Sequence, residues 1–537
     1  MRWSRMTAVI AMGIAITGIL NATGCTAWRT PLPHHAGIHA HASIEHSNLP
    51  AAAAPLPLEK PPPVAPPPPK EVQQPKDAVA PLKLSEPPKT PVSANPLLLD
   101  EVIRQLDSSF PLLLAIVQER EIAAGQRLAA EGAFDLNLRS RGTNQEGSFQ
   151  NSTFDIMLEQ QTLLYGLSAF GGYRLGLGDF PVYNGGRKTN QGGEFRAGFL
   201  LPLLRGGAID PARASLAIAQ INERLADPVI QRARIDFRRA AARAYWTWVG
   251  TGEQYRVAVS LQQLAEARQD LVQIQERNGF RAELDVLDNR RQVSERLEAT
   301  ERAEQAFQAA AIDLSLFIRD AEGNPVMPPG DRLPNNFPGA NVTAPTATEL
   351  DIAVREAYEA RPELARFRLL AERVGVDLAL ARNLILPELS AGASLARDVG
   401  ETKTSSADQT SGELFLQFNV PLQRRLAFGR VRVNQALQAQ LTAQARFARD
   451  QIQADVQQAH AALLQATKRL TAARAEVSHA DAVVVKARFQ FDQGAGDLIA
   501  LNFREIFAAT ARLKVVQALA DYYRAEADLK AAIGKTE

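Results

Sequence analysis

The most regular pattern in this 537-residue chain is a heptad repeat of apolar positions near its C-terminus. Large apolar residues recur every seven positions from Val456 to Phe491, and an alanine follows most of them three positions later. This pattern is typical of a left-handed coiled coil packed at close range. It predicts a helix over residues 429–492 and a matching one over residues 211–277, each on the order of 90–100 Å long. In the earlier segment the predicted seam is Val257, Leu264 and Leu271, with Ser260, Ala267 and Ile274 three positions later.

Short segments in which apolar and polar residues alternate predict β-strands with one apolar face. They lie at residues 134–138, 154–158, 173–177, 195–199, 389–395 and 414–420. A strand with one apolar and one polar face is typical of a membrane β-barrel, but closed membrane barrels need at least eight strands. The chain offers about four to six, so several chains must share one barrel if these strands enter a membrane. The alternative is a soluble sheet that caps a helical rod.

The part of the chain predicted to fold is an internal duplication. Leu201-Pro202-Leu203-Leu204 recurs as Val420-Pro421-Leu422, and each motif separates a strand segment from a long helix. We expect one repeat over residues 98–320, a connector over 321–348 and a second repeat over 349–537. The pattern indicates a mainly helical fold with a strand segment inserted in each repeat.

The two repeats differ in the length of their strand segments. The stretch from Pro111 to Pro202 is about 30 residues longer than the stretch from Pro362 to Pro421. The additional length contains a Gly- and aromatic-rich piece, residues 165–180. This piece predicts either an extra pair of strands or an elaboration of the outer face, and the sequence leaves open whether it adds strands to a barrel.

The N-terminus predicts export. A short basic region and an apolar segment precede Ala22-Thr23-Gly24-Cys25, which resembles a bacterial lipoprotein signal over residues 1–24. That resemblance implies that Cys25, the only cysteine, becomes the acylated first residue and carries palmitate; the alternative is an ordinary signal peptide. Residues 25–97 are rich in proline and predict a disordered tether. Five of the seven histidines lie there, which suits loose metal binding or a solvated linker.

Composition and motifs exclude several classes of protein. The net charge of +1 provides no basic footprint for nucleic acid, and one cysteine excludes a disulfide scaffold. Beyond the N-terminus no apolar run is long enough for a membrane helix, which excludes a polytopic helical transporter. Nucleophile-elbow, zinc-protease, P-loop and dinucleotide motifs are all missing from the sequence. We therefore expect neither an enzyme nor a cofactor, and His460 and His479 read as helix-surface or interface residues.

Taken together, the repeats, the Pro-closed strands, the lipoprotein-like N-terminus and the Asp285-Val286-Leu287-Asp288 turn resemble the TolC family of outer-membrane efflux proteins. The resemblance covers roughly residues 97–534. It implies a homotrimer in the outer membrane, with four strands per chain in a twelve-stranded β-barrel and long coiled-coil helices in a periplasmic α-barrel. It also implies a periplasmic adaptor and an inner-membrane pump as partners, and export of small toxic compounds.

The same resemblance assigns roles to the turns between the long helices. These turns are expected to form the periplasmic aperture and to face the adaptor. The expected residues are Gly279, Asp285, Asp288, Asp492, Gly494, Gly496 and Asp497. In the family, acidic residues of the second turn narrow the opening, whereas here that turn has Ile499 and Asn502 at the places of Asp285 and Asp288. The alternative is that the aspartates cap or solvate helix ends.

Two other functions fit the same pattern. One is the exit duct of a type I-like protein secretion system, and the other is a non-conducting, lipid-anchored coiled-coil scaffold of the envelope. The alternating strands argue against the scaffold, because a rod needs no amphipathic sheet. The sequence leaves open the cargo, the pump and adaptor, and the resting state of the gate.

Overall fold

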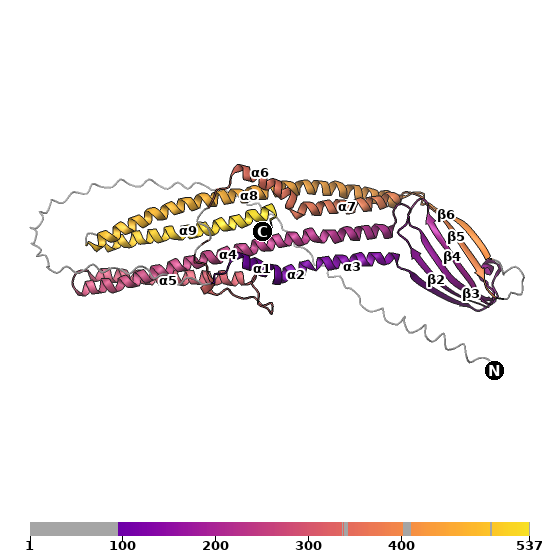
Figure 1. Cartoon of the computed structure of the whole chain (residues 1–537), viewed down its shortest axis with the longest axis horizontal. Coiled ribbons are helices and arrows are strands. Elements are labelled where there is room, and N and C mark those ends of the chain that lie inside the picture. Colours follow the sequence, from indigo (N-terminus) through magenta and orange to yellow (C-terminus); the bar gives the residue numbers. More distant parts are fainter. Residues whose placement is uncertain (1–94, 336, 338–341, 401–409, 494–496, 536–537) are drawn as a thin grey trace, which may run out of the picture. The chain divides into compact units, whose positions relative to one another are not determined.

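Two very long helices organise the part of the chain that the structure describes, residues 95–335, 337, 342–400, 410–493 and 497–535 of a computed structural model. Helix α4 spans Pro211–Arg277 and helix α8 spans Arg425–Asp492, which confirms both predicted long helices. Each turns back into a shorter partner, α5 (Glu283–Ser315) or α9 (Leu498–Ile533). In both halves the long helix packs along the partner that follows it (Figure 1).

Shorter helices precede each long one. The first half has α1 (Leu99–Ser109), α2 (Pro111–Val117), α3 (Glu119–Glu131) and the 3-10 turn η1 (Gly132–Phe134), and the second has α6 (Ala347–Ala360) and α7 (Pro362–Asn383). Two further 3-10 turns are η2 (Val182–Arg187) and η3 (Gly330–Arg332). No helix among the described residues is both long and apolar enough to cross a bilayer.

Local sequence explains where the helices start and stop. Proline occupies the first position of α2, α4 and α7, where its missing N–H is not needed. Thr346 and Glu349 form a reciprocal capping box at the start of α6. Gly534 ends α9 with a positive φ of 91°, a left-handed conformation that glycine adopts without strain.

The main core lies where α1, α4 and α5 meet. Leu106, Trp248 and Leu314 are completely buried there. The Tyr245 hydroxyl donates a 2.8 Å hydrogen bond to the Leu97 carbonyl, and burial raises the pKa of this phenol well above its usual value. This core joins the N-terminal end of the described chain to the middle of α4.

In α8 the predicted heptad seam is buried from Val456 to Leu470 and half-buried at Val477, Val484 and Phe491, and most of the alanines three positions later are buried. In α4 its large positions are only half-buried, and the positions three residues later are exposed, so the prediction is wrong for the second set. In α4, Ala267 and Ile274 are exposed, whereas Ala265, Arg268 and Val272 are buried. The cause is that α4 contacts α9 as well as α5, so its buried stripe is set by two neighbours and includes a charged residue.

All described strands belong to one antiparallel sheet in which neighbours in sequence are neighbours in space, in the order β1-β2-β3-β4-β5-β6 (Figure 1). The strands are β1 (Asn137–Gln145), β2 (Asn151–Gln161), β3 (Ser168–Gly178), β4 (Glu194–Pro202), β5 (Glu388–Asp398) and β6 (Thr410–Asn419). The pairing of β4 with β5 joins the two halves of the chain. The extra length of the first half is therefore a strand pair, and the four strands that the resemblance implied are six.

One face of the sheet is mainly apolar from β2 to β6, and in β1 it carries Leu138 with Ser140 and Gly142. The other face is mainly polar, although it includes Phe170 and Phe415. The register sets Leu138 opposite Leu158, Tyr173 opposite Phe195, and Leu395 beside Ala197. On the other face, Arg174 pairs with Asp155 across β2 and β3 at 2.8 Å. Most of the large apolar side chains remain open to solvent in the single chain, up to 87% for Leu414. An apolar surface of this extent indicates an interaction with lipid or with another protein.

Candidate functional site at the helical hairpin tips

Residues 278–282, between α4 and α5, form a tight turn that we call the first tip. Gly279 has a φ of +75°, and a Cβ built on it would meet nothing within 4 Å. The Gly279 N–H donates to the Glu276 carbonyl, and the Phe280 N–H donates to the Gln275 carbonyl. Glycine is needed here for its backbone conformation rather than for space.

The second tip, residues 493–497, joins α8 to α9. Asp497 caps α9 by accepting a 3.3 Å hydrogen bond from the Ile499 N–H. Gly494, Gly496 and the side chain of Asp492 lie outside the described part of the chain, as does Cys25 near the N-terminus. Asp497 therefore has a helix-capping role that is independent of any role at an aperture.

The two aspartates of the first predicted turn have basic partners within their own hairpin. Asp285 lies 3.8 Å from the Arg281 guanidinium, and Asp288 accepts a 3.2 Å hydrogen bond from Arg291 Nε. The hydrogen bond to Asp288 raises the pKa of Arg291. Each carboxylate is thus partly neutralised locally, which weakens the field that it would project into an opening.

The two tips contact each other. Phe491, at the end of α8, packs against buried Val272 of α4 and Val286 of α5. The Arg281 guanidinium lies 5.0 Å from the centre of the Phe491 ring, which is a cation–π distance. The two predicted turns therefore lie together at one end of the helices, although equivalent positions of the two repeats, such as Asp288 and Asn502, are 214 residues apart in the sequence.

A buried ion-pair cluster joins the two hairpins farther from the tips, and the sequence analysis missed it. Glu505 of α9 accepts hydrogen bonds from Arg268 of α4 at 2.6 Å and from Arg488 of α8 at 3.1 Å. Arg268 also donates to Asn502, and all except Arg488 are less than 9% exposed. Asn502 thus packs between helices, although its place in the repeat matches Asp288. The sequence feature that could have indicated this cluster is an arginine at position 268, next to the predicted seam.

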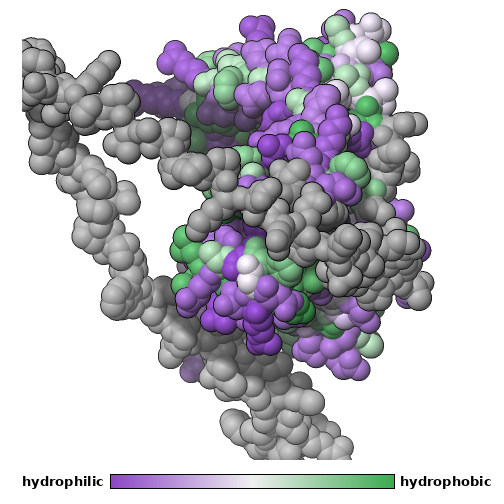
Figure 2. Space-filling model, turned by 90° about the vertical axis from the view of Figure 1, so that its left-hand side faces the viewer, coloured by the Kyte–Doolittle hydropathy of each residue, from purple (hydrophilic) through white to green (hydrophobic). Residues whose placement is uncertain are grey.

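Large apolar side chains remain exposed on both hairpins near the tips. They are Phe280, Leu284 and Leu287 on the first hairpin, and Val485, Phe489, Phe503 and Phe507 on the second. Figure 2 looks onto this end of the helices and shows green apolar patches among purple polar surface. A surface of this kind suits burial against further protein.

The described residues contain no group of three or more histidine, cysteine or acidic side chains placed to hold a metal ion. His460 is buried, and its Nε2 lies 3.0 Å from the Thr346 carbonyl, so this ring joins α8 to the start of α6. His479 is exposed on α8. The five histidines of the predicted tether lie outside the described residues.

These features define a class of protein: long paired helices that carry an amphipathic antiparallel sheet at one end and close hairpin tips at the other. Solved structures of outer-membrane channels share this fold. One described as the outer-membrane channel OprN is 14% identical, with a TM-score of 0.55 over 81% of this chain and 89% of that one. The open-state MtrE outer membrane channel of Neisseria gonorrhoeae is 15% identical, with a TM-score of 0.58 over 82% and 89%. The CmeC outer membrane channel of Campylobacter jejuni is 12% identical, with a TM-score of 0.56 over 81% and 85%.

Residues 353–535 match the family model described as outer membrane efflux protein. No curated protein sequence matches the chain. The resemblance to the TolC family of outer-membrane efflux proteins is therefore confirmed, in sequence for the second repeat and in fold for the described chain. The matching family is described as efflux proteins and the three solved structures as channels, none of them as an enzyme, which agrees with the prediction from sequence.

Proposed function

We propose that this chain is one subunit of a homotrimeric outer-membrane channel that exports small toxic compounds in a tripartite efflux system. The observation that carries the proposal is the six-stranded sheet, which has an exposed apolar face and two edges without a strand partner among the described residues. Such a sheet is unstable in lipid unless further copies close it. The helices joined to it would continue the channel as a tunnel.

The hairpin tips are the proposed periplasmic end of that tunnel. A three-fold axis would repeat Asp285, Asp288, Asp492 and Asp497 as rings of like charge, which attract cations and resist close approach. The partners of Asp285 and Asp288 make the proposed ring weaker than the bare sequence suggests. Gly279, Gly494 and Gly496 would allow the tight reversals that an adaptor protein contacts.

The proposal includes an anchor and a tether. Cys25 would carry the lipid that holds the mature N-terminus in the outer membrane. The predicted tether, residues 25–97, would span from the anchor to the folded body, but it would end before Leu97, which is buried in the main core. The exit duct of a protein secretion system remains a second proposed function, because a trimeric tunnel serves either cargo. A lipid-anchored scaffold would not explain why the sheet has an exposed apolar face.

The first test is native mass spectrometry of the protein extracted from outer membranes in mild detergent. We expect a detergent-stable trimer whose subunits carry lipid mass on Cys25. A soluble monomer, or a dimer released by salt, would contradict the channel and leave the scaffold. A trimer without lipid would contradict only the anchor, and a Cys25→Ser variant is the matched control for the lipid mass.

The cargo needs a separate test. Deletion of the gene should sensitise cells to small toxic compounds if the chain serves efflux. Loss of a secreted protein, with unchanged sensitivity to small compounds, would favour the secretion duct. Crosslinking from a photoreactive residue at Phe280, with the same residue at exposed Leu297 in α5 as control, tests whether the first tip contacts an adaptor.

A further inference from the structure

We propose that three copies of the chain close into one eighteen-stranded β-barrel, with β6 of each copy paired to β1 of the next. The inference rests on the proposed trimer and adds the number of strands in its membrane barrel. Three copies of six strands give eighteen, in place of the twelve that the resemblance implied. The additional strands belong to the longer first half of the chain.

The additional strands are full members of the sheet. The ladder between β2 and β3 runs unbroken from Asn151 opposite Gly178 to Gln161 opposite Ser168. On its far side β2 pairs with the whole of β1, and β3 pairs with β4 from Ser168 to Arg174. These strands therefore span the sheet from one end to the other, which a loop on the outer face would not do.

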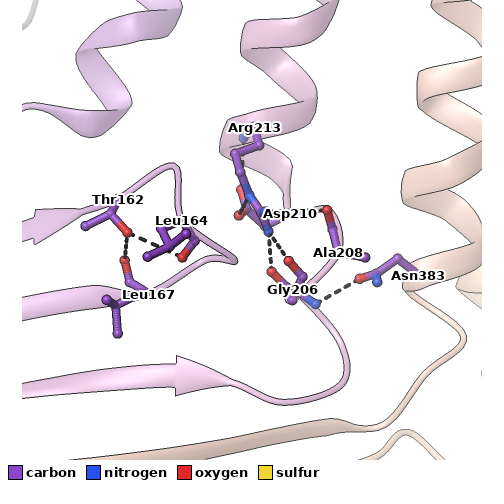
Figure 3. Close-up of polar contacts among 9 residues, drawn as sticks. Thr162, Leu164, Leu167, Gly206, Ala208, Asp210, Arg213 and Asn383 are labelled. Carbon is purple, nitrogen blue, oxygen red and sulfur yellow. Dashed lines mark hydrogen bonds and ion pairs between the residues drawn. The ribbon is translucent and has the colours of Figure 1, made fainter.

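The turn between β2 and β3 packs against the junction of the sheet with the helices (Figure 3). Within the turn, the Thr162 hydroxyl donates to the Leu167 carbonyl at 2.7 Å. A Cβ on Gly166 would lie 2.5 Å from the Gly206 carbonyl oxygen, so this turn and the β4–α4 connection are in close contact. That connection is held in turn by Arg213, which donates to the carbonyls of Gly206 and Gly207. The inner end of the extra strand pair thus has a fixed place at the helix junction.

The apolar face continues across the extra strands without a break. Phe154, Ile156 and Leu158 of β2 lie on the same face as Leu138 of β1 and Tyr173 of β3. On the opposite face the ion pair between Arg174 and Asp155 joins the two extra strands to each other. If β2 and β3 lay outside the barrel, the alternation of apolar and polar residues along these two strands would have no function.

The two free edges suit each other. β1 follows α3 and runs away from the helices, whereas β6 runs toward the helices and leads into α8. Adjacent copies would therefore pair β6 with β1 in the antiparallel sense of all the other ladders. The two strands are of similar length, Asn137–Gln145 and Thr410–Asn419, and nearly every residue of both is exposed. A long open edge in lipid leaves backbone groups unpaired, which costs several kcal/mol for each group.

The width of the sheet also fits the helices that lead into it. Four helices connect to the sheet, and they pack side by side in the order α3, α4, α7, α8. At a spacing of about 8–10 Å they occupy about 32–40 Å of circumference. Strands about 4.8 Å apart and tilted by about 40° occupy about 6 Å each, so six strands span about 38 Å and four only about 25 Å. Six strands therefore continue the tunnel without narrowing it.

The same arithmetic sets the size of the outer pore. With that spacing and tilt, eighteen strands give a backbone diameter of about 36 Å, and twelve strands give about 24 Å. Barrels of sixteen to eighteen strands leave an aqueous channel. The outer mouth should therefore pass larger solutes than a twelve-stranded mouth would.

Crosslinking between copies tests the inference. Ser140→Cys in β1 is combined with Leu414→Cys, Leu416→Cys or Phe418→Cys in β6, which samples the register on one face, and a short bifunctional thiol reagent is added. We expect covalent trimers from at least one pair and none from the single variants, which also control for Cys25. The competing pair is Leu175→Cys in β3 with the same β6 positions, because a twelve-stranded barrel that left out β1 and β2 would seat β6 on β3.

The outcomes separate the two proposals. Covalent trimers through Ser140 show that β1 meets β6 of the next copy, and they support eighteen strands because β1 is joined to the rest of the sheet only through β2 among the described strands. A non-covalent trimer that crosslinks only through Leu175, or through neither position, overturns the eighteen-stranded barrel and leaves the trimeric channel intact. Absence of a trimer in the unmodified chain contradicts the proposed function and, with it, the barrel.

A deletion provides an independent measurement. Replacement of residues 146–193 by a two-residue Asn-Gly turn removes β2 and β3 and joins β1 to β4 in the correct direction. In lipid bilayers, polymers added from the outer side should enter the full-length channel up to a larger size than they enter the deletion variant. An equal size limit in an assembled deletion trimer would overturn the inference; if the variant does not assemble, the crosslinks decide.

Discussion

At the residue scale, the most consequential side chains near the tips are those that hold the two hairpins together. Glu505 takes part in two ion pairs, one with each hairpin, and lies 9% exposed at its side chain. A heptad pattern reports apolar positions only, so it does not reveal which charged residues are buried together. The cluster of Arg268, Asn502 and Glu505 therefore depended on the structure. Gly279 was identified as a turn residue from sequence, whereas Asp285, predicted in the same turn, lies in the first turn of α5.

Replacement of Glu505 by glutamine tests the cluster. The change retains the shape of the side chain but leaves Arg268 buried without a counter-charge, which costs about 3–5 kcal/mol. We expect a lower unfolding midpoint in urea, followed by the circular dichroism of the helices in detergent. The matched control is Glu298→Gln, whose ion pair with Arg302 is exposed and should cost less than about 0.5 kcal/mol. Equal effects of the two changes would show that the buried pair contributes no more than a surface one.

Two glycine-to-alanine changes separate backbone strain from packing. Neither Gly279 nor Gly375 has an atom within 4 Å of a built Cβ, but only Gly279 has a positive φ. Alanine at 279 should destabilise the fold by about 1–2 kcal/mol, since a left-handed conformation is unfavourable for it. Alanine at 375, inside α7, should stabilise by about 0.5–1 kcal/mol. The two melting temperatures should therefore move in opposite directions, and a shift of the same sign would refute this account of the first tip.

At the element scale, the sequence predicts the secondary structure of each segment more accurately than it predicts the packing partners of that segment. The bounds of α4 agree with the prediction because Pro211 and Gly279 are local signals. The strands are found by alternation, although β1 begins at Asn137 and Phe134 lies in a 3-10 turn. The α4 seam is wrong because two partner helices compete for one stripe. Strand number and order were open, since alternation marks a strand but not its neighbour.

The junction of β4 with α4 carries a prediction at this scale. Asp210 accepts from the Arg213 N–H at 2.9 Å and pairs with Arg213 Nε at 2.6 Å, so it caps the helix and holds the guanidinium that binds the Gly206 carbonyl (Figure 3). Asp210→Asn preserves the cap and should cost about 1–2 kcal/mol, whereas Asp210→Ala loses both functions and should cost about 3 kcal/mol.

Thermal melting of the two Asp210 variants measures these costs, and cleavage within residues 203–210 under limited proteolysis should increase in the same order. The control is Glu295→Ala, whose exposed pair with Arg291 should contribute about 0.5 kcal/mol or less. If asparagine and alanine at position 210 had equal effects, the capping hydrogen bond would contribute nothing.

At the scale of the whole molecule, four short connections join the sheet to the helices. The sheet has two faces of different polarity, whereas the helices pack along buried apolar seams. The helices bury an apolar stripe within the chain but leave other large apolar residues exposed, such as Phe447, Phe489 and Phe507, whereas the sheet exposes most of its own. This contrast follows from the sequence in both cases: heptads direct apolar side chains toward a partner helix, and alternation directs them to a single sheet face. The exposed sheet face is therefore, like the apolar surface near the tips, a part of the fold that favours an environment other than water.

Adjacent residues of β6 test which environment that is. Leu416 lies on the apolar face, opposite Ala391, and Gln417 lies on the polar face, opposite Ser390. If the apolar face contacts lipid, Leu416→Arg should cost about 2–4 kcal/mol near the middle of the bilayer, whereas Gln417→Arg should be close to neutral. The yield of heat-stable trimer in the outer membrane measures the difference, with position 417 as the matched control. Because both residues are exposed on one strand of the single chain, equal yields would mean that neither face meets lipid and that the sheet is a soluble cap.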